Sequence, residues 1–414
     1  MSEAKDPPHP YRWGVLFGVW LMYFSFGLSI SSMAPLVAEI TADLGLSKSA
    51  MGTVLGAWQL IYIAAALPLG ALMDRTGVAI GIAFAGCVMA ASLALRGVAG
   101  SELQLFLAVA VFGLGGPLMS IGAPKLIALW FQGADRGMAM GVYMTGPALG
   151  GIASLTLANP VLVPLTGSWR GAMWALAAFI VLATVMWWAI SRHSEARARD
   201  GKITGLSKAG SLSAFLDIAR IRTVQIVLIM AIGIFMLNHG LNNWLPEILR
   251  AKGMTATEAG FWSAIPTIVG VIGALTIPRF ATPKRRVAIM LALFLSVGLS
   301  TVLLHLLPGP GLVTGLMLQG IARSSMMTVA ILLLMEAPGV PPERAGMAGG
   351  MFFTVAEIGG VLGPASIGVV ADGFGGFGAS LVMLSGVAVL MLALLAWLRW
   401  IEIGHARAAQ PGPG

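Results

Sequence analysis

Long apolar stretches that lack charged side chains recur along the whole of this 414-residue chain. An α-helix needs about 20 apolar residues to cross the hydrocarbon core of a bilayer, and residues 171–191, 260–278 and 373–398 form uncharged stretches of about that length. Only 10% of the residues are charged while 57% are hydrophobic, which leaves too little charge to cover a water-facing surface. The composition therefore predicts a membrane protein and excludes a soluble enzyme, a disordered chain and a disulfide-stabilised secreted domain.

Turn signals divide the apolar sequence into helices of spanning length. For example, Pro308-Gly309-Pro310 interrupts an uncharged stretch that is too long for one span. The predicted fold class is an all-α membrane protein with twelve transmembrane helices. The predicted spans are residues 13–41, 50–73, 77–98, 102–131, 137–165, 170–191, 222–249, 256–279, 287–307, 311–336, 345–371 and 376–400.

The positions of Lys and Arg predict how these helices are oriented. Most of the 25 basic residues fall at the two termini and in alternate connections, which the positive-inside rule places in the cytoplasm. The few on the opposite side are Lys48, Arg96, Arg170, Arg250 and Lys252. We therefore expect a multi-pass protein of a cell inner membrane with both termini in the cytoplasm. The net charge of +8 then reflects topology rather than nucleic-acid binding.

Two segments of the first half resemble segments 208 residues further along the chain. Residues 45–52 align with 253–260, and residues 136–141 align with 344–349, in both cases at a predicted junction between loop and helix. The shared offset predicts two parallel six-helix pseudo-repeats, an architecture in which transporters bind substrate between the repeats near the bilayer midplane. The predicted domains are an N-terminal six-helix bundle at residues 1–192, a cytoplasmic linker at 193–216 and a C-terminal six-helix bundle at 217–414.

The connection between the second and third predicted spans carries a loop motif. Gly70, Asp74, Arg75 and Gly77 form the pattern Gly-x-x-x-Asp-Arg-x-Gly, and on these residues the chain resembles the major facilitator superfamily. The resemblance implies a twelve-helix transporter that works by alternating access, with Asp74 and Arg75 in a gating role on the cytoplasmic side. The basic pair that continues the family motif is absent, because residues 78–79 are Val and Ala, and this weakens the implied charge network.

The fifth predicted span contains Gly146-Pro147-Ala148-Leu149-Gly150-Gly151, which is similar to a motif of the superfamily's antiporters. Glycines let neighbouring helices approach closely, and Pro147 withdraws a backbone donor and permits a bend. Gly146 and Pro147 are therefore predicted to take part in gating. Ordinary tight helix packing is the alternative interpretation.

A narrower resemblance lies in the second half of the chain. Trp244, Pro246, Gly253 and Gly260, followed by the pair Arg285-Arg286, are spaced much as in bacterial cyanate-transporter-type permeases. This resemblance implies a small anion or a small polar solute as the transported molecule.

Three charged side chains stand out because they lie deep within predicted spans, where a charge is costly unless it faces a cavity or a partner. Arg323, in the tenth span, is predicted to bind an anion because a guanidinium presents a planar set of donors to a carboxylate. The alternative is a structural ion pair with Glu357. Lys125, in the fourth span, is predicted to contact substrate, or alternatively to extend towards the interface. Glu357, in the eleventh span, is predicted to be the proton-coupling residue, if it does not pair with Arg323.

Polar side chains cluster in the seventh predicted span, which the family resemblance places on the transport pathway together with the first, fourth and tenth. Asn238, His239, Asn242 and Asn243 include amide pairs one helical turn apart. We expect them to hydrogen-bond the substrate, with hydrogen bonding between helices as the alternative. Tyr23 in the first span is predicted to line the same cavity. No metal site is predicted, because no second His or Cys stands at ligand spacing.

Together these features predict a secondary active transporter, and no enzyme. It would move a small organic or inorganic anion, either a carboxylate or a cyanate-like species, by alternating access coupled to protons, through symport or antiport. The sequence contains no nucleotide-binding loop and no hydrolase motif, which excludes primary active transport by this chain alone and gives no support to a membrane enzyme. We expect no cofactor, and we expect a monomer. Two alternatives stay open, namely a proton-driven efflux antiporter for hydrophobic drug-like compounds and a non-transporting membrane receptor or scaffold.

Overall fold

The computed structural model describes residues 9–200, 212–306, 309–337, 339–341 and 344–408. Throughout these ranges the chain forms helices joined by turns, and twelve helical segments are long and apolar enough to cross a membrane. The predicted all-α membrane fold with twelve transmembrane helices is therefore confirmed. Residues 201–211, which belong to the predicted cytoplasmic linker, lie outside the described residues.

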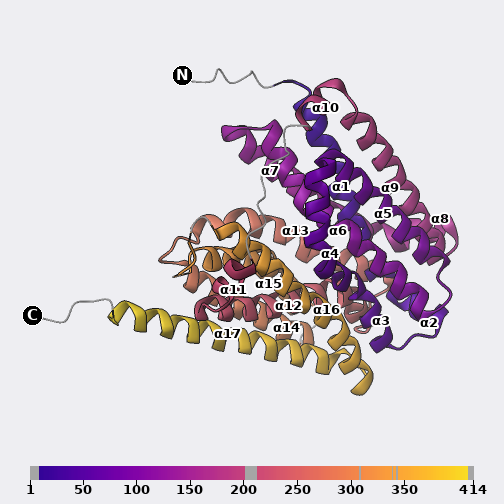
Figure 1. Ribbon diagram of the computed structural model, residues 1–414. Helices are drawn as coiled ribbons and strands as arrows, with labels where there is room; N and C mark the ends of the chain where they lie inside the picture. The colour runs from indigo at the N-terminus through magenta and orange to yellow at the C-terminus, as the bar shows by residue number, and fades with distance from the viewer. Residues whose placement is uncertain (1–8, 201–211, 307–308, 338, 342–343, 409–414) are drawn as a thin grey trace, which may run out of the picture. The chain divides into compact units, whose positions relative to one another are not determined.

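Three of the spans consist of more than one helix. The first is made of α1 (Arg12–Ser31), a short 3₁₀ helix η1 (Ala34–Leu36) and α2 (Val37–Leu44), and the second of α3 (Lys48–Leu55) and α4 (Ala57–Thr76). In the fifth, α7 (Gly133–Leu157) continues through a π-helical stretch η2 (Ala158–Leu162) into α8 (Val163–Thr166). The other helices, all visible in Figure 1, are α5 (Val78–Val98), α6 (Glu102–Trp130), α9 (Trp169–Ser191), α10 (Ser194–Asp200), α11 (Leu212–Ala219), α12 (Arg222–Arg250), α13 (Ala256–Phe280), α14 (Arg286–Leu306), α15 (Pro310–Met335), α16 (Ala345–Gly373) and α17 (Phe377–Ala408).

Hydroxyl side chains fix where four of the helices begin. Ser47, Ser101, Ser168 and Thr255 each accept a hydrogen bond from the backbone N–H three residues further along, at the N-termini of α3, α6, α9 and α13. At Thr255 the carboxylate of Glu258 reaches back to the backbone N–H and completes a capping box. Each cap of this kind contributes about 1 kcal/mol to the helix, so local sequence sets these boundaries.

The chain divides into two compact units. Unit 1 is drawn from Met1–Gly45 and Ala57–Lys208, and unit 2 from Leu46–Gly56 and Ala209–Gly414. Helix α3 therefore packs within unit 2, although the predicted N-terminal bundle of residues 1–192 contains it. The steric reason is a close approach of α3 to α16, since a side chain at Gly52 would come within 2.5 Å of the carbonyl oxygen of Pro364.

The same order of helix contacts occurs in both units. In unit 1, α1 packs on α7, α6 packs on α4 and α5, and α5 packs on α9. In unit 2, α12 packs on α16, α15 packs on α13 and α14, and α14 packs on α17. Each of these contacts in the first unit thus has a counterpart in the second, which is the arrangement expected of two duplicated six-helix bundles.

Glycines mark equivalent close contacts in the two units. A side chain on Gly150 of α7 would collide with the carbonyl oxygen of Phe24 in α1, and a side chain on Gly359 of α16 would collide with the carbonyl oxygen of Ile232 in α12. Phe24 and Ile232 are separated by the repeat offset of 208 residues. The backbones of these helix pairs therefore approach closely at corresponding positions, as small residues permit in membrane helices.

Candidate functional site

A guanidinium and two amides meet within unit 2. Arg323 lies in the middle of α15, and its Nη2 donates hydrogen bonds to Oδ1 of Asn238 at 3.1 Å and to Oδ1 of Asn242 at 3.4 Å. The two asparagines lie one turn apart on α12 and therefore share a face of that helix. The structure thus brings together three residues that the sequence predicted to bind substrate.

The positive charge of Arg323 has no carboxylate partner among the described residues, because none of their ion pairs includes it. Its Nε is buried and lacks a hydrogen-bond partner in the described structure. A guanidinium has five N–H donors, and the two amide oxygens, which are neutral, engage only Nη2. The site therefore combines an uncompensated positive charge with unused donors, which suits a bidentate anion such as a carboxylate.

Glu357 forms no ion pair with Arg323 in the described structure. Its side chain on α16 is 5% exposed, and its Oε2 is buried without a hydrogen-bond partner within the described ranges. The structural ion pair between Glu357 and Arg323, which the sequence left open as an alternative, does not form in the structure. A buried carboxyl group without an ion partner in a membrane helix is a feature typical of functional sites.

The other two polar residues predicted in the seventh span have different surroundings. Asn243 is 5% exposed, and its Nδ2 donates to the backbone carbonyl oxygen of His239 at 2.8 Å. Its amide group is therefore tied to its own helix. The His239 ring is partly exposed and lies beside the Phe235 ring, with 5.5 Å between centroids. The substrate contacts predicted for Asn243 and His239 stay predictions.

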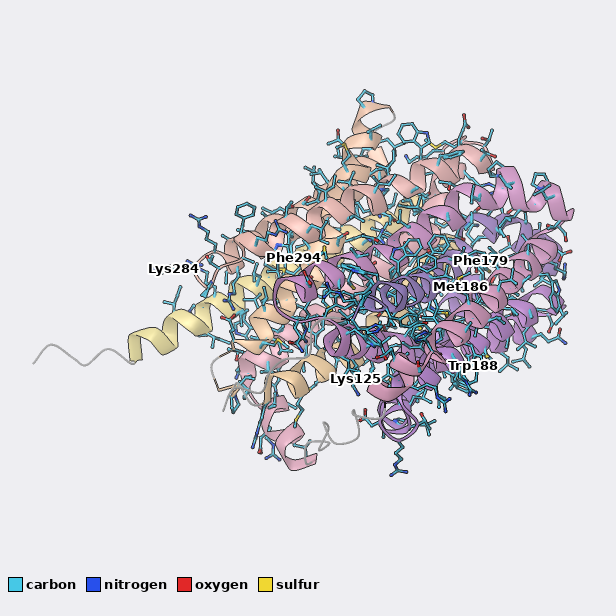
Figure 2. The ribbon with its side chains drawn as sticks, turned by 90° about the horizontal axis from the view of Figure 1, so that it is seen from above. Lys125, Phe179, Met186, Trp188, Lys284 and Phe294 are labelled. Atoms are coloured by element: carbon cyan, nitrogen blue, oxygen red, sulfur yellow. The ribbon has the colours of Figure 1, made fainter. Side chains whose placement is uncertain are left out.

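Lys125 and Asp74 form an ion pair inside unit 1. Lys125 of α6, labelled in Figure 2, places Nζ 2.5 Å from Oδ1 of Asp74 in α4. A carboxylate therefore balances the charge of Lys125 in this conformation. Arg75, the neighbour of Asp74 in the loop motif, is exposed at the end of α4. The substrate role predicted for Lys125 and the gating roles predicted for Asp74 and Arg75 stay predictions.

Tyr23, Gly146 and Pro147 all belong to the contact between α1 and α7. Tyr23 is 8% exposed, and its ring meets the Tyr143 ring edge-on at 5.2 Å between centroids. Gly146 faces α1 so closely that a side chain there would come within 2.9 Å of the carbonyl oxygen of Trp20. Pro147 lies inside α7, and its own carbonyl group is the contact of Gly27. Neither the cavity role of Tyr23 nor the gating role of the Gly-Pro pair is tested by this packing.

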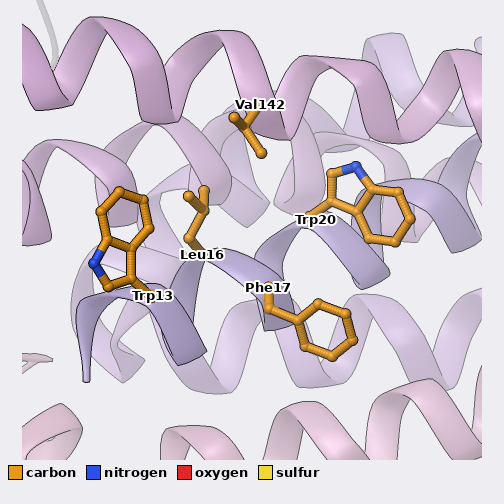
Figure 3. Close-up of a pocket in the computed structure, with 5 residues that line it drawn as sticks. All are labelled: Trp13, Leu16, Phe17, Trp20 and Val142. Carbon is orange, nitrogen blue, oxygen red and sulfur yellow. The ribbon is translucent and has the colours of Figure 1, made fainter. Parts of the chain in front are cut away.

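An apolar pocket lies on another part of unit 1, between α1 and α7 (Figure 3). It has a volume of about 330 Å³ and is lined by Trp13, Leu16, Phe17, Trp20 and Val142. These side chains supply no charge and only indole N–H groups as donors, and Nε1 of Trp20 already donates to Thr145. This pocket therefore offers no charged group to hold an anion.

Sequence reasoning missed two polar residues that the structure buries. Gln319, one turn before Arg323, is fully buried, and neither atom of its amide group has a hydrogen-bond partner in the described chain. Arg96, expected near a loop, lies inside α5 and is 2% exposed. The available signal was the same in both cases, a polar side chain flanked by apolar residues of spanning length. The location of Arg96 near the end of its span obscured that signal.

In the part of the chain that the structure describes, twelve helices long enough to cross a membrane form two units with matching helix contacts, and Arg323 has no carboxylate partner. These features are typical of a membrane transport protein. The sequence pattern of the family described as Major Facilitator Superfamily matches residues 19–360. The chain belongs to the Major Facilitator Superfamily.

Three relatives are similar along most of the chain. The probable galactarate/D-glucarate transporter GudP of Bacillus subtilis (strain 168) is 23% identical over 430 residues, covering 94% of this chain and 91% of the relative. The hexuronate transporter of the same strain is 24% identical over 392 residues, covering 90% of each protein. The probable sulfoacetate transporter SauU of Cupriavidus necator is 23% identical over 414 residues, covering 93% of this chain and 92% of the relative. These names do not support the predicted likeness to cyanate-transporter-type permeases, which rested on residues with mainly structural roles.

Among solved structures, the fold is similar to that in the crystal structure of the nucleoside transporter NupG. The TM-score is 0.77 at 15% sequence identity, and the match covers 94% of this chain and 99% of the other. At this identity the likeness establishes the shared fold.

Proposed function

We propose that this protein is a secondary carrier that moves a small organic anion across the cell inner membrane by alternating access, coupled to protons. The observation that carries the proposal is the guanidinium of Arg323, which faces two amide oxygens and has no carboxylate partner in the described structure. A membrane-embedded cation of this kind is costly unless it serves a function. An anionic substrate would supply the missing counter-charge.

The chemistry of the substrate follows from the donors at the site. A carboxylate can accept two parallel hydrogen bonds from one guanidinium, which gives both affinity and orientation. Asn238 and Asn242 hold the guanidinium in place and can turn their amide groups towards a ligand. The relatives named for galactarate, D-glucarate and hexuronate support a carboxylate of a sugar acid as the transported anion. His239 and Asn243 lie on the same helix, each next to one of these asparagines, and in the proposed site they would also hydrogen-bond the substrate.

Two further residues of the proposed site need a change of conformation before they can act. Lys125 must leave Asp74 before its charge can reach a substrate. Tyr23 is buried against Tyr143 and must become accessible before it can contact a substrate. In the proposed cycle these contacts change as the carrier alternates, with Asp74, Arg75 and the Gly146-Pro147 pair at the moving positions.

The first experiment tests the anion site. The purified protein is reconstituted into liposomes, and counterflow of labelled D-glucarate and galacturonate is measured for the native chain and for Arg323→Gln. We expect Arg323→Gln to lower counterflow at least tenfold, because about 2 kcal/mol or more is lost when a charged partner is removed from a buried pair. Arg279→Gln removes the same charge from an exposed position of α13 and should leave counterflow unchanged. Equal counterflow in native protein and a folded Arg323→Gln variant would overturn the assignment.

A second experiment tests proton coupling through Glu357. Proton-driven accumulation requires a group that gains and loses a proton during the cycle, and a carboxyl group inside the membrane can serve in that way. Glu357→Gln should abolish accumulation driven by a pH gradient while counterflow, which needs no net proton movement, continues. Accumulation at the native level in Glu357→Gln would exclude this residue as the coupling site.

A further inference from the structure

Gln319 carries a buried amide group on the same helix as Arg323. It lies on α15 one helical turn before Arg323, is fully buried, and has neither a donor nor an acceptor partner for Nε2 and Oε1 within the described chain. Residues four apart on a helix are neighbours on one face. The face of α15 that carries Arg323 therefore also carries an amide group without a hydrogen-bond partner in the described chain.

An unsatisfied amide in this position needs a physical reason. Folded proteins leave few buried polar groups without partners, because each one loses its hydrogen bonds to water and gains nothing in exchange. An apolar residue of similar size would fill the same space without this penalty. A hydrogen-bonding partner that is not part of the protein chain would therefore explain the unused amide group.

The chemistry of the amide defines what that partner can be. Its oxygen accepts hydrogen bonds and its NH₂ group donates two, so it pairs best with a group that can both donate and accept. A hydroxyl group has this property, whereas a second carboxylate only accepts. Because the amide stands one turn from the guanidinium, the matching ligand carries a hydroxyl group a short distance from its carboxylate.

We propose that Gln319 determines specificity for hydroxylated carboxylates, with its amide exchanging hydrogen bonds with a substrate hydroxyl while Arg323 holds the carboxylate. This inference rests on the proposed function, because the carboxylate must bind at Arg323 first. In the described conformation the amide is enclosed. The hydroxyl therefore reaches Gln319 in a conformation of the cycle in which this face of α15 is open, as is usual for sites that close around their substrate.

The substrate class follows directly. A site that hydrogen-bonds a hydroxyl group rejects the analogue that lacks it, because the polar group of the protein is then left without a partner in the complex. Sugar acids and short hydroxy acids fit such a site, and unsubstituted alkyl carboxylates do not. The chain should therefore discriminate between two acids that share a carbon skeleton and differ only in hydroxyl groups.

The test compares D-glucarate with adipate, the six-carbon dicarboxylate that lacks its hydroxyl groups. Each acid competes with labelled D-glucarate in counterflow by the full-length protein in liposomes. We expect the native chain to prefer D-glucarate at least tenfold and Gln319→Leu to reduce this preference by about tenfold. Gln59→Leu makes the same change at a fully buried glutamine of unit 1 and should leave the preference unchanged. Gln319→Met provides a second apolar variant if Gln319→Leu does not fold.

The outcomes separate this inference from the proposed function. If the native chain binds D-glucarate and adipate equally, or if Gln319→Leu weakens both acids by the same factor, Gln319 has a structural role and the inference is wrong while the anion carrier stands. If no carboxylate competes with labelled D-glucarate and Arg323→Gln shows the same counterflow as the native chain, the proposed function and the inference are both wrong. A loss of preference confined to Gln319 variants supports the inference.

Discussion

Lys125 and Asp74 join helices α6 and α4 through an ion pair with 2.5 Å between Nζ and Oδ1. Asp74 belongs to the loop motif shared with the superfamily, and Lys125 lies in a span that otherwise lacks charge after its first turn. The side chains are 32% and 31% exposed, so solvent screens their attraction. This pair is therefore a contact between helices that can form and break at modest cost.

The strength of this pair can be measured with a double-mutant cycle. Lys125→Gln and Asp74→Asn, singly and combined, should give a coupling free energy of unfolding of about 1 kcal/mol or less in detergent micelles, because the pair is partly exposed. The coupling should fall as salt is raised. Arg75→Gln, at the exposed neighbouring position, should show no coupling to Lys125→Gln. A coupling of several kcal/mol, insensitive to salt, would contradict this account.

Arg96 stabilises the point at which the first span breaks. Its Nη1 donates to the carbonyl oxygen of Ser29 at 3.1 Å and to Oγ of Ser32 at 3.0 Å, where α1 ends. At the position 208 residues further on stands Leu304, and α12 runs as one helix from Arg222 to Arg250. In unit 1 the first span is interrupted after α1 and the Arg96 guanidinium binds that interruption. The equivalent described part of unit 2 has a continuous helix and no guanidinium at the matching position.

We therefore expect Arg96→Met to destabilise the protein by about 3 kcal/mol, since hydrogen bonds from a charged group are lost in a buried setting. Hydrogen exchange of the backbone at residues 29–36 should rise in this variant more than elsewhere. Leu304→Met, the same replacement side chain at the counterpart position, should cost about 1 kcal/mol or less. Unchanged exchange at 29–36 in Arg96→Met would show that the break does not depend on the guanidinium.

Sequence reasoning recovered the elements whose cause is local. Apolar length and turn residues predict the twelve spans. The sequence also indicated Arg323, which lies deep in a span, and the pair Asn238 and Asn242, because residues four apart lie on the same face of a helix. The structure then showed that they meet.

The partners of charged side chains could not be predicted in the same way. The sequence shows that Lys125 is inside a span but not that Asp74 lies within reach, because the two are 51 residues apart and meet only through the packing of α4 on α6. The association of α3 with unit 2 was missed for a similar reason. It depends on steric fit at Gly52 and on the cap supplied by Asp372, and neither leaves a local pattern.

Asp372 holds the N-terminus of α3. Its two carboxylate oxygens accept hydrogen bonds from the backbone N–H groups of Lys48 at 3.1 Å and Ser49 at 2.7 Å. A carboxylate at this position satisfies orphan donors and interacts favourably with the helix dipole. Asp372→Ala should therefore lower the free energy of unfolding by about 1 kcal/mol and increase hydrogen exchange at residues 48–51.

The control is Ser47→Ala, which removes the other cap but leaves the link between α3 and α16. Loss of thermal stability in Ser47→Ala alone would assign the cap to Ser47 and not to Asp372.

Gly150 and Gly359 permit close backbone contacts in the α1–α7 and α12–α16 pairs described above, and each has a matched control on its own helix. A methyl group at either position would collide with the carbonyl oxygen of Phe24 or Ile232. Alanine at either position should therefore separate the helices and lower the unfolding free energy by about 2 kcal/mol or more, as overpacking does elsewhere.

The controls are Gly141→Ala in α7 and Gly350→Ala in α16, where an added Cβ meets nothing within 4 Å. Because alanine has the higher helix propensity, these two substitutions should be neutral or stabilising by up to about 1 kcal/mol. The same chemical change is thus expected to have opposite signs within one helix, depending only on whether the glycine faces its partner. Thermal unfolding of the four variants in detergent measures the signs. Equal effects at Gly150 and Gly141 would show that helix propensity, and not the backbone approach, accounts for the glycines in α7, and the same comparison between Gly359 and Gly350 decides the question independently for α16.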